Sequence, residues 1–250
     1  MSTLLVVLVG VVIAVVLIRR LSEERIACNS CLRVVSKRRM TVLADGRLIC
    51  RECLNNTIST VMQSAVGNLA GVGELSRRIV LASLKDAEAL KSDIHAKDEK
   101  DCTKRWFAVV CEFLYFFMHL TSRFAYREFG HERRCKIQDQ LYPLIIRPTI
   151  ESIFGDWPQN LKDGMESEFI ENLGRAEIEY GECKQLLNRA NPLVQDALFS
   201  KFAGNVCELM GADKTDTAAY AGTFMKVLEL ATDSFSQLDL QECLRSLSGR

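Results

Sequence analysis

Apolar residues recur along most of the chain at the spacing typical of amphipathic helices. Between residues 169 and 187, and again between 224 and 238, they return every three or four positions. This interval keeps one face of a helix apolar. The pattern predicts seven helices, near 55–70, 75–96, 102–128, 131–153, 160–190, 192–211 and 216–247. We therefore expect a mostly α protein in which 57–250 form an all-α helical bundle, with a candidate sub-boundary at 97–101.

The most apolar part of this region is 106–120, which contains Phe113, Phe116 and Phe117. A second membrane span is one interpretation of this stretch. However, Glu112 and His119 lie inside it, and ionisable side chains are costly within a bilayer. The composition therefore favours the central core helix of a bundle.

The N-terminal segment has a different pattern, because residues 4–18 are almost continuously apolar. No charge occurs before Arg19 and Arg20. An eighteen-residue helix is roughly 27 Å long, near the short end of a membrane span. A cleaved signal peptide would have a positive segment before its apolar core and small residues at a cleavage site after it. The sequence predicts an uncleaved transmembrane anchor at 1–20 that contacts the membrane through 4–18.

The charges that flank this segment predict its orientation. Positive residues lie only on its C-terminal side, which should therefore be cytoplasmic. We expect a single-pass protein of the inner (cytoplasmic) membrane, with the N-terminus outside and 19–250 in the cytoplasm. Ten cysteines in that reducing compartment would remain thiols or metal thiolates.

Four of those cysteines form two pairs just after the predicted anchor. Cys28-x2-Cys31 is separated by eighteen residues from Cys50-x2-Cys53. Two such pairs at roughly this spacing are typical of a tetrahedral zinc site with four thiolate ligands. Two redox pairs are the alternative, but thioredoxin-like sites need a βαβ setting, which the sequence lacks. We expect one structural Zn²⁺, held with no open coordination position.

The residues between the two cysteine pairs predict a β-hairpin. Short apolar runs at 40–43 and 47–49 flank Asp45 and Gly46, a strong hairpin-turn signal. A helical pattern follows the second pair. The sequence therefore predicts a small zinc finger at 21–56 that contains a β-hairpin and depends on metal for most of its stability.

The two cysteine pairs, their spacer and the following helix, about 26–62, resemble the zinc-binding domain of ClpX-type unfoldases. Treble-clef fingers share the general pattern. The resemblance implies that Cys28, Cys31, Cys50 and Cys53 are the ligands. It also implies a module that dimerises and docks substrates or adaptors. The rest of the chain lacks the GxxxxGK[ST] phosphate loop and does not resemble an ATPase.

Charge is unevenly distributed along the chain. Residues 19–53 hold nine Lys/Arg and four Asp/Glu, whereas 54–250 hold twenty-three and twenty-eight. Arg33, Lys37, Arg38 and Arg39 could contact nucleic acid. A basic stretch beside a membrane span is also attracted to anionic lipid and determines topology. We favour the second interpretation, because it needs no further cause.

Three polar residues share one face of the predicted helix at 102–128. Glu112, His119 and Arg123 are separated by seven and four residues, which places them on the same side. We expect a structural polar cluster in which Glu112 or Glu132 pairs with Arg123 or Arg133. The stretch 112–134 loosely resembles uncharacterised helical domains of bacterial proteins, and this resemblance carries no activity.

A metal site in the bundle is the alternative. Glu128-x-x-His131 has the spacing found in di-iron bundles, but such sites need a second Glu-x-x-His. The chain has three histidines and no second copy of the motif. The six cysteines outside the finger are scattered, and buried apolar positions are expected for most of them.

The sequence gives no nucleophile elbow and no nucleotide-binding loop. We expect a membrane-anchored module for protein interaction, or an adaptor. It would bind a protein partner, or a second copy of the chain through the zinc finger. Nucleic-acid binding at the membrane is the first alternative. An enzyme that uses thiols, or a metal held by Glu112, His119 and His131, is the second.

Overall fold

The computed structural model describes residues 25–36, 40–42, 48–50, 52–53, 56, 70–187 and 196–246. The chain divides into two compact units, Met1–Asn55 and Asn56–Arg250, called here the cysteine unit and the helical unit. The predicted anchor at 1–20 lies outside the described residues, and so does nearly all of the helix expected at 55–70.

The cysteine unit contains two short antiparallel ladders. Strand β1 (Arg25–Ala27) pairs with β2 (Val34–Ser36), and β3 (Met40–Val42) pairs with β4 (Leu48–Cys50). In the second ladder Met40 is opposite Cys50, and Val42 is opposite Leu48. The predicted β-hairpin is therefore present as a pair of strands, although its Asp45-Gly46 turn lies outside the described residues.

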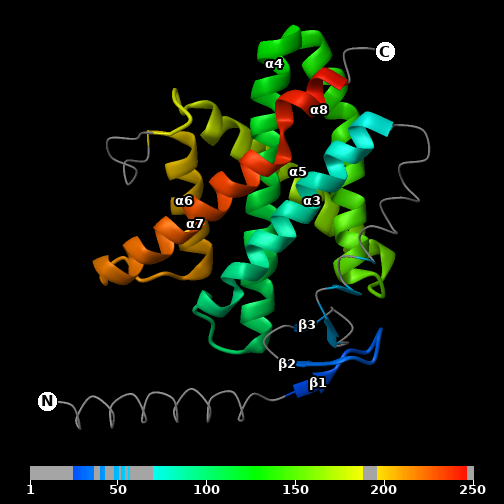
Figure 1. Cartoon of the computed structure of the whole chain (residues 1–250), viewed down its shortest axis with the longest axis vertical. Helices are drawn as coiled ribbons and strands as arrows, with labels where there is room; N and C mark the ends of the chain where they lie inside the picture. The colour runs from blue at the N-terminus through cyan, green and yellow to red at the C-terminus, as the bar shows by residue number, and fades with distance from the viewer. Residues whose placement is uncertain are drawn as a thin grey trace, which may run out of the picture. The chain divides into compact units, whose positions relative to one another are not determined.

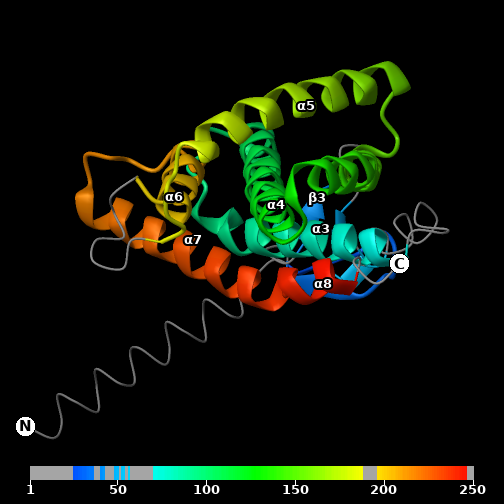
Figure 2. The same cartoon turned by 90° about the horizontal axis from the view of Figure 1, so that it is seen from above.

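The helical unit contains α3 (Ala70–Leu90), α4 (Glu99–Phe154), α5 (Gln159–Gly181), α6 (Leu198–Met210), α7 (Thr217–Leu238) and α8 (Leu240–Ser246), with the 3-10 helix η2 (Lys91–Asp93) after α3. Figure 1 shows their course, and Figure 2 shows α5 on one side of α4 with α3 and α7 on the other. The prediction of a mostly α chain with a small β-hairpin beside four cysteines is confirmed.

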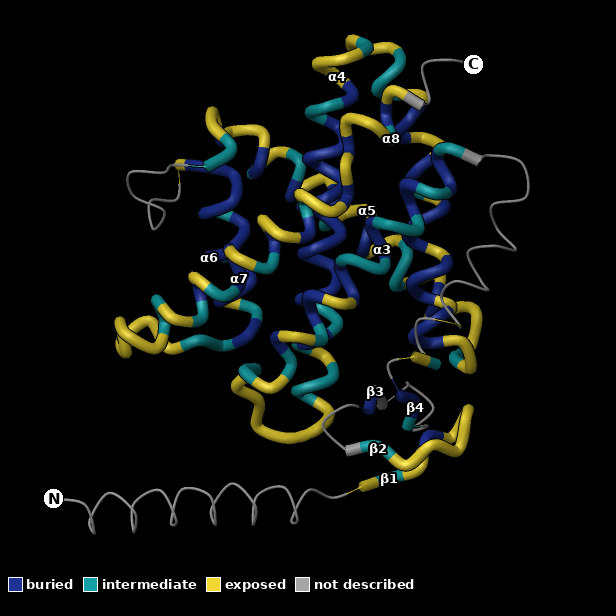
Figure 3. The backbone as a smooth tube through the Cα atoms, in the orientation of Figure 1, coloured by how far each residue is buried: buried dark blue, intermediate teal, exposed yellow. Residues whose placement is uncertain are grey.

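Helix α4 is the centre of this unit. Phe113, Phe116 and Phe117 are fully buried, and the middle of the helix is dark blue in Figure 3. In the described part of the chain α4 is the one helix long and apolar enough to cross a membrane, and 78% of its apolar window is buried. That burial agrees with the expected core helix of a bundle.

The helices predicted at 102–128 and 131–153 are both present, as two segments of α4 that meet at Gly130. Gly130 has a non-helical conformation, with φ 76° and ψ −174°. An L-residue with a side chain rarely adopts this positive φ, whereas glycine does so readily. The first segment therefore ends in a kink at Gly130, and the second continues through Pro143 and Pro148 to Phe154.

The helix predicted at 160–190 ends earlier, at Gly181, although the apolar spacing continues to Leu187. The chain beyond Gly181 bonds to other elements instead. The amides of Leu198 and Phe199 donate to the carbonyls of Gln185 and Leu186 at 3.0 Å each. These bonds satisfy amides at the start of α6 that have no partner within the helix, so tertiary pairing outweighs helical spacing here.

The polar face of α4 contacts α5 and α6 rather than its own arginines. The Glu112 Oε1 atom accepts hydrogen bonds from the Tyr180 hydroxyl and from Asn205 Nδ2, the latter at 3.0 Å. His119 Nδ1 lies 3.1 Å from Glu177 Oε2.

The expected pairing of Glu112 with Arg123 is therefore wrong. Arg123 Nη2 donates to the Cys183 carbonyl at 2.9 Å. Glu132 binds Lys136 at 2.7 Å, and the Arg133 guanidinium lies over the Phe129 ring, 4.8 Å from its centroid. Glu112 and Arg123 are eleven residues apart, about 16 Å along a helix, which is too far for an ion pair.

Glu112 should make the stability of the helical unit depend on pH. Burial raises the pKa of this carboxyl, and the hydrogen bonds from Tyr180 and Asn205 offset only part of that rise. The folded protein therefore binds a proton more tightly than the unfolded chain. The resulting stabilisation is complete below the unfolded pKa, near 4.5, and is lost as pH rises through the folded pKa.

We expect Glu112→Gln, which mimics the protonated carboxyl, to gain stability relative to the wild type as pH increases from about 4 to 8. Urea unfolding followed by circular dichroism at several pH values measures the difference. Glu171→Gln, an exposed change on α5, is the matched control and should keep the wild-type slope. An unchanged slope in Glu112→Gln would contradict the assignment.

Candidate metal centre

The first cysteine pair lies in a tight turn between β1 and β2. The amide of Cys28 donates to the Arg33 carbonyl at 2.9 Å, and the amide of Leu32 donates to the Cys28 carbonyl at 2.9 Å. Leu32 adopts φ 59°, a left-handed conformation that is uncommon for leucine. The turn presents Cys28 and Cys31 from the same end of the ladder.

The second pair follows strand β4. Cys50 is the last residue of that strand, and Glu52 and Cys53 are helical. Asn29 links the two pairs, because its amide donates to the Leu48 carbonyl at 2.8 Å and its Oδ1 accepts from the Leu48 amide at 3.1 Å. The first turn is therefore fixed against the strand that carries Cys50.

An ion pair also joins the turn of the first cysteine pair to the helical residues at the second pair. Arg33 Nη1 pairs with Glu52 Oε2, and both side chains are well exposed. Exposed pairs contribute about 0–1 kcal/mol. The backbone and Asn29 hydrogen bonds therefore determine the arrangement more than this ion pair does.

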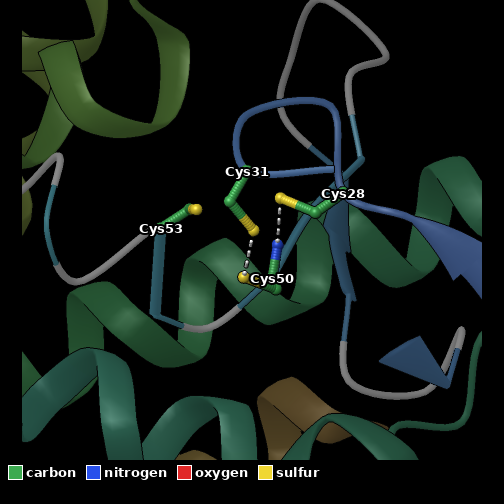
Figure 4. A group of neighbouring side chains, drawn as sticks. All are labelled: Cys28, Cys31, Cys50 and Cys53. Atoms are coloured by element: carbon green, nitrogen blue, oxygen red, sulfur yellow. Dashed lines mark hydrogen bonds between the residues drawn. The ribbon is translucent and has the colours of Figure 1, made fainter. Parts of the chain in front are cut away.

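The four sulfur atoms converge on one point (Figure 4). All four lie within 4.8 Å of one another, and the Sγ atoms of Cys31 and Cys50 are 3.7 Å apart. Four sulfurs placed about 2.3 Å from a central zinc form a tetrahedron with edges of about 3.8 Å. The donor set and its spacing therefore fit a metal ion bound by four thiolates.

Backbone amides already stabilise a thiolate in this cluster. The amide of Cys50 donates to Cys28 Sγ at 3.2 Å. Burial raises the pKa of the Cys28 thiol, but hydrogen bonds from the backbone of Cys31, Cys50 and Ser30 outweigh it and lower the pKa to about 6. Burial raises the pKa of Cys53 to about 12. A cation at the centre would favour the thiolate form of every member.

Cys28 and Cys50 are buried, Cys53 is half-buried and Cys31 is exposed. A metal held by four thiolates has no open position for water or substrate, which gives it a structural role. The sequence alternative of two separate redox pairs fits less well, because the structure brings all four sulfurs into one group.

The other candidate ligands are not brought together. Within the described residues, the four cysteines are the one group of three or more such side chains that could hold a metal ion. His131 Nε2 lies 3.8 Å from Cys135 Sγ, while His119 faces Glu177 on α5. Glu112, His119 and His131 therefore do not form the metal site considered as an alternative.

Sequence reasoning did not find the β1–β2 ladder that brackets the first pair. Ile26, Ala27, Val34 and Val35 are the apolar residues of its strands, a weak signal because each strand has only three residues. Comparison of the chain with protein-family models, curated proteins and solved structures found no significant match.

Proposed function

We propose that the chain is a membrane-anchored zinc-finger protein whose finger docks a protein on the cytoplasmic face of the inner membrane. One structural Zn²⁺ would be bound by Cys28, Cys31, Cys50 and Cys53. The observation that carries the proposal is the closed four-cysteine cluster, which provides a rigid surface and no reactive position. The resemblance to the ClpX-type zinc-binding domain supports a docking role by analogy.

Exposed apolar side chains in and just after the turn between β1 and β2 support a contact with protein. Leu32 and Val34 are 76% and 62% exposed, and they flank Arg33. Two neighbouring apolar side chains beside a charged one are a suitable contact for a protein surface, where apolar area is buried within a polar rim. Either another protein or a second copy of this chain could cover them.

Nucleic-acid binding has less support. Arg33, one of the four basic residues considered for it, is paired with Glu52, which offsets its charge. The other three, Lys37, Arg38 and Arg39, lie outside the described residues. A metal-dependent enzyme has less support too, because the residues described contain no second group of side chains that could hold a metal ion.

Site-specific photo-crosslinking tests the docking role. A photoreactive amino acid at Leu32 of the full-length protein should form a covalent protein adduct in cells, and the adduct should disappear when Cys50→Ser is added. The same label at Leu161, an exposed residue of α5, is the matched control. An adduct at twice the chain mass would identify a homodimer. Absence of a zinc-dependent protein adduct, or adducts with nucleic acid alone, would refute the docking role.

The membrane anchor has its own test. In a bacterial host we expect the full chain to remain in the membrane pellet after alkaline carbonate extraction, and a variant lacking 4–18 to become soluble. The reason is that an uncharged stretch of about eighteen residues reaches the lower limit for spanning the bilayer core. Replacing 4–18 by leucines of equal number should restore pelleting. Protease added outside spheroplasts should spare the C-terminal part, and its digestion would contradict the orientation.

A further inference from the structure

A cavity of about 550 Å³ lies between α4 and α5, with Leu209 of α6 in its wall. The two helices lie side by side in Figure 2. Phe107, Tyr115, Met165 and Phe169 give it a largely apolar lining. Small-molecule sites are typically roughly 300–1,000 Å³, mostly apolar, with a few polar groups that orient the ligand. Both the size and the lining of this cavity fit such a site.

Glu112 supplies a polar group that is almost completely buried in this cavity. Its residue is 9% exposed, and it belongs to the cavity lining. The Oε1 atom accepts hydrogen bonds from Tyr180 and Asn205. No hydrogen bond from the described residues reaches Oε2. The Tyr180 and Asn205 bonds therefore hold the carboxyl in place while one oxygen remains able to accept from a ligand.

No cation around the cavity is bonded to Glu112. Among the described residues no lysine or arginine forms an ion pair with it, although the nearby Lys201 lowers the pKa of its carboxyl. Glu179, also in the lining, already pairs with Lys201 at 2.7 Å. Lys104 and Arg175 are the cations of the lining, and Arg175 donates a hydrogen bond to the Asn172 amide oxygen. Burial disfavours the ionised form of a carboxyl that has no cation bonded to it. A ligand that brings a positive charge and a hydrogen-bond donor would stabilise that ionised form of Glu112.

We propose that the cavity binds a small apolar amine, whose ammonium group donates to Oε2 of Glu112. The hydrocarbon or aromatic body of the amine packs against Phe107, Tyr115 and Phe169. The site belongs to the helical unit and depends on neither the zinc centre nor the membrane anchor. It assigns to this unit a ligand-binding role beyond the docking function of the finger.

Isothermal titration of the full-length protein in detergent with phenethylamine tests the proposal. 2-Phenylethanol and 3-phenylpropionate are the neutral and anionic comparisons of similar shape. A charge-assisted hydrogen bond corresponds to an affinity difference of about ten-fold or more. We expect phenethylamine to bind at least about ten-fold more tightly than phenylethanol, and phenylpropionate to bind least.

Glu112→Gln should weaken phenethylamine binding about ten-fold while leaving phenylethanol binding unchanged. Glu171→Gln, on α5 and not in the cavity lining, should match the wild type. Ala108→Phe fills the cavity from α4 without changing the carboxylate, so it should weaken the binding of both the amine and the alcohol. Circular dichroism melting verifies that each variant is folded.

Three results would overturn the proposal. One is the absence of phenethylamine binding at millimolar concentration. Another is equal or tighter binding of the alcohol or the anion. The third is amine binding that neither Glu112→Gln nor Ala108→Phe reduces, because the amine would then bind elsewhere on the protein.

Discussion

Replacement of Cys50 by serine is expected to remove zinc and unfold the cysteine unit while the helical unit remains folded. The unit has two ladders of three-residue strands and too small a core to be stable alone. Structural zinc contributes roughly 10–16 kcal/mol of apparent binding free energy in small fingers at neutral pH, which far exceeds what these ladders supply. Serine is a much weaker zinc ligand than a thiolate, so most of that free energy should be lost.

Elemental analysis and amide hydrogen exchange measure the two parts of this result. The wild type should contain one zinc per chain and protect the amides that bond within the unit, such as those of Asn29 and Cys50. Cys50→Ser should contain almost none and lose that protection. The melting of the helical unit should change little, because Cys50 belongs to the other compact unit.

Cys102→Ser is the matched control, since Cys102 is half-buried at the start of α4 and outside the cluster. It should keep one zinc and the protected amides. Zinc retained in Cys50→Ser, or iron bound independently of Cys50, would contradict the four-thiolate assignment and support thiol or bundle-metal chemistry instead.

The four cysteines could be predicted as a group because the signal is local. Two residues separate the members of each pair, which fits a turn around one metal ion. The position of Asn29 between the pairs was not predictable in this way. Its bonds to Leu48 connect residues nineteen positions apart, and short-range patterns carry no information about such a contact.

Helix limits were predicted less well where tertiary bonds compete with apolar spacing. Asp216 was correctly placed at the start of a helix, and its side chain accepts from the Ala219 amide at 3.0 Å. The same reasoning extended α5 too far, because Arg123 and the start of α6 bond to the carbonyls of Cys183, Gln185 and Leu186. A cap is a local feature, whereas these bonds come from distant helices.

Glu112 was recognised as a polar residue on an apolar helix, but its partners were not. Tyr180 and Asn205 lie sixty-eight and ninety-three residues away. Sequence spacing shows which residues share a helix face and does not show which helix covers that face. The pairing with Arg123 therefore rested on a shared helix face alone, and the cavity beside Glu112 could not have been inferred at all.

Phe116→Ala should be among the most destabilising single changes in the helical unit. Phe116 is fully buried, and its ring stacks on Phe202 at 4.2 Å and meets Phe199 edge-on at 4.9 Å. Removing a buried phenylalanine costs about 3–5 kcal/mol, because transfer free energy is lost and a cavity remains. For a unit of this size that lowers the melting temperature by roughly 10 °C.

Urea unfolding of the full-length protein measures the loss. Ile178→Ala, an exposed aliphatic on α5, is the matched control and should change stability by less than about 0.5 kcal/mol. Equal effects of the two substitutions would show that Phe116 is not part of the packed core.

The stacking of Phe116 on Phe202 also predicts an energetic coupling between α4 and α6. In a double-mutant cycle, Phe116→Ala and Phe202→Ala together should cost less than the sum of their separate effects. The shortfall should be about 0.5–1.5 kcal/mol, the range measured for aromatic pairs. Each single change already removes the shared contact, so the second change has less left to remove. Strict additivity would mean that the two rings contribute independently, and α6 would then not be held to α4 through this pair.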